Sequence, residues 1–152
     1  MRRSKPDVAD ATDCERVALN LLARREYSRH ELERKLAARG FAQERIAQTL
    51  DALEESGALA AARFTASFIC ARAAKGQGPA RIRAELTERG IDRDQAEELL
   101  RDAAIDWAAL AASVRDKRFG AERPTDFKER ARQTRFLEYR GFDGEQIDSA
   151  LG

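Results

Sequence analysis

The chain is poor in the residues from which most enzyme sites are built. Its 152 residues include one histidine, two cysteines, one tryptophan and three prolines. Cys14, Cys70 and His30 are not spaced as metal ligands, and no serine, cysteine or histidine forms part of a nucleophile–base pattern. The composition therefore predicts a protein that is not an enzyme and that uses no metal or cofactor.

Long apolar runs are also missing. Nowhere does the sequence provide the run of about 18 apolar residues that a membrane helix needs, and the basic start at Arg2 and Arg3 is followed by no apolar stretch of a signal peptide. Two cysteines in a charge-rich chain suit a reducing compartment. We expect a cytoplasmic protein without a membrane segment.

Charge is abundant but balanced, with 28 basic and 27 acidic residues and a net charge of +1. This balance argues against a protein that simply coats nucleic acid. The charges are nevertheless segregated along the chain. Residues 63–91 hold six basic and two acidic residues, residues 92–106 hold two and six, and residues 115–140 hold nine and five.

The most informative feature is an internal repeat. A glycine that follows an arginine and precedes an apolar residue recurs at intervals of 50 and 51 residues, as Gly40, Gly90 and Gly141. Four residues before each glycine is a leucine: Leu36, Leu86 and Leu137. This pattern predicts a helix that ends at a left-handed glycine, with the leucine of the last turn against the residue after the glycine.

Helix starts are marked as well. Ser28 and Glu31 form a capping-box pattern, Asp92 and Asp143 each precede a glutamine by three residues, Pro79 suits a first helical position, and Thr125 or Asp126 precedes the last long helix. Together with the glycines, these signals predict nine helices at residues 13–26, 28–39, 43–56, 60–75, 79–89, 93–103, 105–118, 126–140 and 144–151. The boundary near 103–105 has no helix breaker.

The predicted fold is all-α, with three tandem three-helix repeats that form an elongated array, curved to the right or to the left. The expected divisions are a disordered tail at residues 1–11 and repeats at 12–57, 58–103 and 104–152. A three-helix unit of this size is near the lower limit for folding alone, so neighbouring repeats should share apolar surface.

The middle segment resembles the RecX family. The resemblance is carried by an Arg63-Phe64 helix, the turn Lys75-Gly76-Gln77-Gly78-Pro79, and a helix from Arg81-Ile82-Arg83 to Arg89-Gly90-Ile91. The first repeat resembles the family's opening and the third its ending, so that the likeness spans roughly residues 17–151. The chain departs from the family at Ala60 and Ala61, where acidic residues are common, which puts the start of the fourth helix in doubt.

The resemblance implies a partner and an activity. RecX proteins bind the RecA–DNA filament and inhibit the recombinase, ATPase and co-protease activities of RecA, and so modulate DNA repair and the SOS response. We therefore expect a RecA regulator, with weak single- or double-stranded DNA binding as a possible addition. Two alternatives remain: a direct DNA-binding helical-repeat protein, because three-helix units resemble helix-turn-helix modules, and an adaptor for another protein.

Basic side chains in the second and third repeats are the candidates for partner binding. They are Arg63, Arg72, Lys75, Arg81, Arg83, Arg130, Arg132 and Arg135. The alternative is that these residues form ordinary solvated helix faces with ion pairs four residues apart, as the spacing of Arg81 and Glu85 allows. Gly76-Gln77-Gly78 lacks the preceding strand of a phosphate-binding loop and is interpreted as a turn between two helices.

Overall fold

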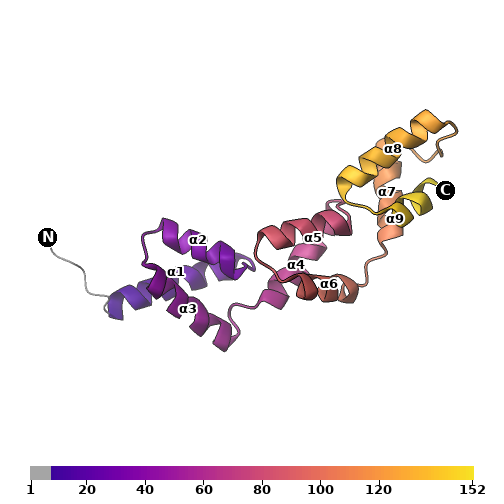
Figure 1. The fold of residues 1–152 in the computed structure, drawn as a ribbon. Helices are drawn as coiled ribbons and strands as arrows, with labels where there is room; N and C mark the ends of the chain where they lie inside the picture. The colour runs from indigo at the N-terminus through magenta and orange to yellow at the C-terminus, as the bar shows by residue number, and fades with distance from the viewer. Residues whose placement is uncertain (1–7) are drawn as a thin grey trace. The chain divides into compact units, whose positions relative to one another are not determined.

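The computed structural model describes residues 8–152, and this part of the chain is all-helical (Figure 1). Its helices are α1 (Val8–Arg24), α2 (Arg29–Ala38), α3 (Gln43–Ser56), α4 (Ala61–Ala74), α5 (Pro79–Glu88), α6 (Arg93–Asp102), α7 (Trp107–Phe119), α8 (Phe127–Arg140) and α9 (Gly144–Leu151). The all-α class and the order of the helices are confirmed.

Two compact units make up the structure. One contains the described chain from residue 8 to Thr65 together with Arg89–Ile91, and the other contains Ala66–Glu88 and Asp92–Gly152. In the first unit, α1, α2 and α3 pack against one another in pairs. Its core consists of buried residues from these helices and the connections between them: Cys14, Val17, Ala18, Tyr27, Leu32, Leu36, Ile46, Leu50, Leu53 and Leu59.

The second unit pairs α5 with α6 and packs α7 against α8 and α9. The apolar core around α7 is made by Ala111, Val114, Leu137, Phe142, Ile147, Ala150 and Leu151, with Trp107, Leu110 and Phe136 partly buried against it. Ile82 and Leu86 of α5 and Leu100 of α6 are also buried. Apolar residues at helical spacing therefore supply the core, as the sequence pattern predicts.

The repeated glycines end equivalent helices. Gly40, Gly90 and Gly141 follow α2, α5 and α8 with φ angles of 92°, 80° and 100°. At the first, the N–H of Gly40 donates to the Ala37 carbonyl at 3.0 Å and that of Phe41 donates to the Leu36 carbonyl at 3.3 Å. The same pair of bonds closes α8, and this is the Schellman arrangement that the repeat predicts.

The helix starts also follow the sequence signals. Ser28 and Glu31 form a complete capping box, as do Asp143 and Gln146. Of the two candidates before α8, it is Asp126 that accepts a hydrogen bond from the Glu129 N–H. Pro79 begins α5, and α4 begins at Ala61 without an acidic residue in its first turn.

The structure corrects one prediction and adds two details. Helix α1 begins at Val8, so the predicted tail at 1–11 is helical from Val8 on, and its remainder lies outside the described residues. The predicted break between α6 and α7 is present and is made by Ala104, which has a left-handed φ of 53°, and by Asp106, which caps α7. Of the two cysteines, Cys14 is buried, whereas Cys70 is on the exposed side of α4.

Neither a membrane-spanning helix nor a metal-ligand cluster is present in residues 8–152. No described helix is long and apolar enough to cross a membrane. In the same residues, no group of three or more histidine, cysteine or acidic side chains is placed to hold a metal ion.

Candidate interaction surfaces

The predicted basic residues of α4 and α5 are mostly held in ion pairs. Arg72 and Arg81 both reach Glu85, at 3.1 and 3.4 Å, and Arg83 pairs with Glu97 of α6. Arg81 and Arg83 of α5 therefore pair with different carboxylates. These arginines link α4, α5 and α6 through ion pairs, and their charge toward solvent is partly cancelled.

The remaining predicted arginines show the same tendency. Arg63 contacts Glu26 at 2.5 Å and donates to the Ala58 carbonyl at 2.9 Å. In the third repeat, Arg132 pairs with Glu129 at 2.8 Å and Arg130 lies 3.8 Å from Asp148. In the described part of the chain, only Lys75 and Arg135 of the predicted set have no carboxylate within 4.0 Å.

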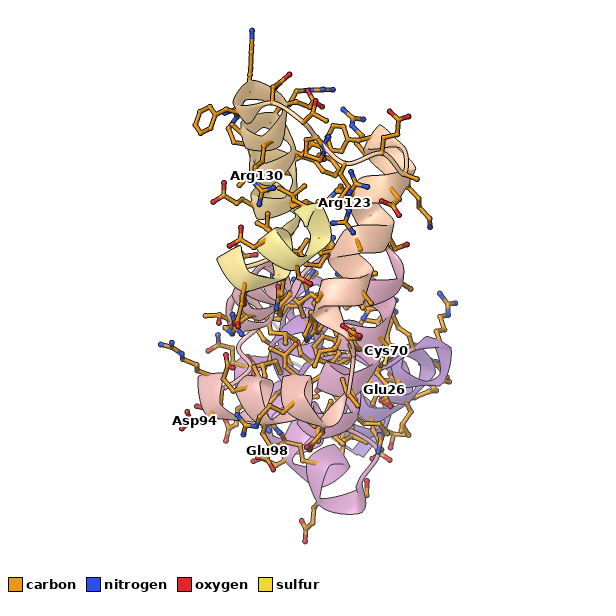
Figure 2. The ribbon with its side chains drawn as sticks, turned by 90° about the vertical axis from the view of Figure 1, so that its right-hand side faces the viewer. Glu26, Cys70, Asp94, Glu98, Arg123 and Arg130 are labelled. Atoms are coloured by element: carbon orange, nitrogen blue, oxygen red, sulfur yellow. The ribbon has the colours of Figure 1, made fainter. Side chains whose placement is uncertain are left out.

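Acidic side chains gather elsewhere. Helix α6 carries Asp94 and Glu98 in exposed positions (Figure 2). They belong to the acidic segment at residues 92–106, which follows the basic segment of the middle repeat. The separation of charge along the sequence therefore persists as exposed charge on α6.

The predicted Lys75 lines a basic hollow in the second unit, which we call the third-repeat hollow. Its volume is about 280 Å³, and four cations line it: Lys75, Lys117, Arg118 and Arg140. The rest of the lining is Ala74, Gly76, Leu110, Ser113 and Val114, so no acidic residue takes part. The hollow is therefore a concave surface with cationic and hydroxyl donors over an apolar floor.

Aromatic stacking and backbone bonds fix two of these cations. The guanidiniums of Arg118 and Arg140 lie 5.4 and 5.0 Å from the ring centre of Phe136. Arg140 also donates to the carbonyls of Lys75 and Gly76, both at 3.4 Å. The cation–π contacts restrict the rotamers of both arginines, and the hydrogen bonds to backbone carbonyls restrict Arg140 further.

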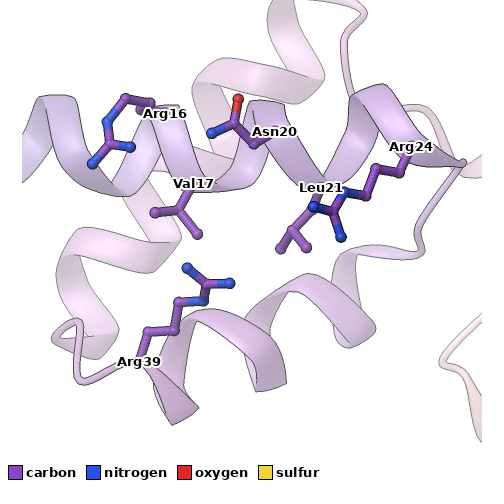
Figure 3. A pocket seen from close by; sticks show the side chains of 6 residues that line it. All are labelled: Arg16, Val17, Asn20, Leu21, Arg24 and Arg39. Carbon is purple, nitrogen blue, oxygen red and sulfur yellow. The ribbon is translucent and has the colours of Figure 1, made fainter.

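A second basic hollow lies in the first unit and is called here the first-repeat hollow (Figure 3). Its volume is about 220 Å³, and its lining is Arg16, Val17, Asn20, Leu21, Arg24 and Arg39. Arg16 pairs with Asp13 at 3.3 Å, whereas Arg24 and Arg39 have no carboxylate partner in the described residues. Figure 3 shows Val17 and Leu21 on the side of α1 that faces Arg39.

The two hollows are built from equivalent positions. Each uses four residues of the first helix of its repeat at intervals of three, four and seven: Val17, Asn20, Leu21 and Arg24 in α1, and Leu110, Ser113, Val114 and Lys117 in α7. Each is completed by the arginine that precedes the left-handed glycine, Arg39 or Arg140. Equivalent positions of the first and third repeats thus line a cationic hollow, and the third-repeat hollow is extended by Ala74, Lys75 and Gly76 of the middle repeat.

A buried arginine supports the third repeat. Arg115 is 2 % exposed and donates to the carbonyls of Ala121 and Glu122 at 3.2 and 3.0 Å, as well as to the Gln133 side chain at 3.2 Å. Its other partner is Asp116 at 2.5 Å. Arg115 therefore holds the loop between α7 and α8 from inside, a role that the sequence did not indicate.

One carboxyl group of the first unit has a shifted pKa. Burial alone would raise the pKa of Glu31, but hydrogen bonds from the Ser28 N–H and the Arg25 guanidinium outweigh this and lower the pKa below its ordinary value of 4.5. The charged form of Glu31 is therefore stabilised in part by the capping box at the start of α2.

The residues of the two hollows were missed by reasoning from sequence, apart from Lys75. The basic surplus at 115–140 included Lys117, Arg118 and Arg140, but it also included residues that the fold places in ion pairs. The recurring arginine before each glycine was a usable signal. Its convergence with the first helix of the repeat, however, depends on how the helices pack.

Three tandem three-helix units, each with a second helix that ends at a glycine, define a helical-repeat protein. Comparison with family models identifies the family of helical-repeat proteins. Residues 14–53 match the first three-helix domain of RecX, residues 62–100 match the second and residues 105–151 match the third. The chain belongs to the RecX family.

Curated relatives agree with this assignment. The Regulatory protein RecX of Pseudomonas entomophila is 50% identical over 136 residues, which cover 90% of this chain and 88% of the relative. That of Halorhodospira halophila is 47% identical over 134 residues, covering 88% and 83%. The chain is thus similar to regulatory proteins over most of their length.

The fold also matches solved structures. The crystal structure of RecX from Lactobacillus salivarius superposes with a TM-score of 0.81 at 20% identity, over 95% of this chain and 96% of that one. A crystal structure of a regulatory protein RecX gives a TM-score of 0.78 at 18% identity, over 97% of this chain and 79% of that one. The tandem three-helix fold is therefore that of known RecX structures.

Proposed function

We propose that this protein is a cytoplasmic regulator, without catalytic activity of its own, that binds the RecA–DNA filament and inhibits RecA. The inhibited activities are strand exchange by the recombinase, ATP hydrolysis and the co-protease function, and the consequence is modulation of DNA repair and the SOS response. The proposal is supported by one observation above all: the three domains of the RecX family are matched in order from residue 14 to residue 151.

The charge distribution is compatible with this mode of action. A net charge of +1 gives little general attraction to DNA, whereas local basic surfaces can face an acidic partner. The predicted basic residues retain this role in the proposal, and Lys75 and Arg135, which lack carboxylate partners in the described residues, are its most available members.

The test is the DNA-dependent ATPase of RecA. Addition of the purified protein at substoichiometric to equimolar ratios should lower ATP hydrolysis, and the protein should sediment with preformed RecA–DNA filaments. A matched reaction with bovine serum albumin at the same concentration controls for crowding and surface loss. An unchanged ATPase together with no co-sedimentation would refute the proposal.

A further inference from the structure

The middle and third repeats meet turn to turn and have no common apolar core. The helices that pack closely in the second unit belong to the same repeat: α5 packs with α6, and α7 packs with α8 and α9. Among the described residues, every member of the apolar core around α7 comes from the third repeat. A contact between two folded parts that lacks a large apolar area leaves them free to move relative to each other.

Backbone groups at two helix ends make this junction. The N–H groups of Gly78 and Ala80, at the start of α5, donate to the carbonyl oxygens of Arg140 and Gly141, at the exit of α8, at 2.8 and 2.9 Å. The first N–H groups and the last carbonyl groups of a helix have no partner within their own helix. The positive end of the α5 dipole also faces the negative end of the α8 dipole. Each repeat therefore caps a helix of the other.

Separation of the two turns costs less than unfolding of either repeat. The four capping groups lie in turns, where water can replace their lost partners, so that opening leaves no polar group both buried and unsatisfied. Unfolding, in contrast, exposes an apolar core such as the one around α7. The junction is therefore expected to open locally while both repeats stay folded.

Arg140 bridges the junction with its side chain. Its guanidinium stacks on Phe136 within the third repeat and donates to the carbonyls of Lys75 and Gly76 in the middle repeat. An added Cβ at Gly76 would lie 3.0 Å from Arg140 Nη1, so the guanidinium lies directly against this turn. Arg118 stacks on the same ring but makes no hydrogen bond among the described residues. The two arginines thus differ in their contact with the middle repeat.

We propose that the junction of Gly78 and Ala80 with Arg140 and Gly141 is a latch, which opens when the third repeat moves away from α5 as a folded body, and that the Arg140 side chain holds it closed. The third-repeat hollow combines Lys75 with residues of α7 and α8, so it is complete only when the latch is closed. This inference does not rest on the proposed function, because it concerns a contact within the chain alone.

The test is native-state hydrogen exchange of the whole protein, followed by NMR. The Gly78 and Ala80 N–H groups have no other acceptor in the described chain, so they exchange when the latch opens. Both should be protected equally, by about 100-fold, and the core N–H of Leu137 should be protected far more. Protection of all three N–H groups to the same extent would show a rigid joint and overturn the inference.

The Ile82 N–H separates opening of the latch from fraying of α5. It donates to the Gly78 carbonyl at 3.2 Å, within the first turn of the helix. Opening of the latch leaves this bond intact, so Ile82 should exchange more slowly than Ala80. Exchange of Ile82 at the rate of Ala80 would mean that α5 frays, and the latch would be rejected.

Two matched variants test the role of Arg140. Arg140→Gln should speed exchange at Gly78 and Ala80 about ten-fold and leave Leu137 unchanged. Arg118→Gln is the control, because it removes the same charge and a contact with the same Phe136 ring but no bond to the middle repeat; its exchange rates at the junction should equal those of the wild type. Equal acceleration in both variants, or none in Arg140→Gln, would refute the role assigned to Arg140.

Discussion

The backbone N–H of Gly78 donates to the carbonyl oxygen of Arg140 at 2.8 Å, which joins the turn before α5 to the end of α8. The Ala80 N–H donates to the Gly141 carbonyl at 2.9 Å, and the Arg140 side chain returns to the carbonyl of Gly76. The turn at Gly76–Gly78 of the middle repeat is therefore hydrogen-bonded to the turn at Gly141 of the third repeat. This accounts for Gly78, which sequence analysis interpreted only as part of a connecting turn.

The close fit of these turns predicts that equivalent glycines differ in their tolerance of alanine. A Cβ at Gly40 would meet nothing within 4 Å, so Gly40→Ala should cost about 1 kcal/mol for the left-handed backbone alone. A Cβ at Gly141 would lie 2.6 Å from the backbone nitrogen of Arg81, so Gly141→Ala should cost about 3 kcal/mol or more. Urea denaturation followed by circular dichroism measures both.

Gly78→Ala separates steric from conformational cost, because the φ of Gly78 is not in the left-handed region. An added Cβ would lie 2.5 Å from the Gly141 carbonyl and 2.6 Å from the Phe142 nitrogen, both backbone atoms. The loss of stability should exceed that of Gly40→Ala. A smaller loss than at Gly40 would show that the two turns are not closely packed in solution.

Arg115→Met should destabilise the third repeat by roughly 3 kcal/mol, because it leaves the carbonyls of Ala121 and Glu122 and the buried side chain of Gln133 without their donor. Thermal unfolding by calorimetry measures the change. Arg93→Met, at an exposed position of α6, should stay within about 0.5 kcal/mol of the wild type. Equal effects of the two substitutions would contradict the buried role of Arg115.

The lowered pKa of Glu31 predicts a pH-dependent contribution to stability. The unfolded chain binds this proton more tightly than the folded one, so the contribution is fully present above pH 4.5, the ordinary pKa, and is lost as the pH falls through the lower value in the folded state. The difference in free energy of unfolding between the wild type and Glu31→Gln should therefore be largest near neutral pH and shrink in acid. A difference that does not vary with pH would be inconsistent with the shift.

The basic surface of the middle repeat is tested through RecA. Arg81→Glu with Arg83→Glu should weaken inhibition of the RecA ATPase several-fold and leave the helical circular dichroism spectrum intact. Because both arginines are ion-paired, Glu85→Gln with Glu97→Gln is the matched control, which removes these two pairs and that of Arg72 with Glu85 but keeps the guanidiniums. Inhibition that survives the arginine reversal would mean that this surface does not contact RecA.

Local signals were sufficient for most of the secondary structure. Capping at Ser28 and Asp143 and the left-handed glycines Gly40 and Gly141 act over at most six residues, so the sequence pattern predicts them directly. The break at Ala104 was not marked by a glycine or proline. Alanine rarely adopts a positive φ, so the packing around Ala104 must maintain it. No local sequence pattern reports such packing.

What the sequence alone determined was thus the all-α class, the triplication and the family, because these depend on spacing along the chain. The tertiary structure decided which charges remain available. Arg83 and Arg132 are neutralised by Glu97 and Glu129, whereas Lys117 and Arg140 come together in a hollow without a carboxylate. The physical reason is that ion pairing and convergence depend on distances between helices, and these are set by packing across the core.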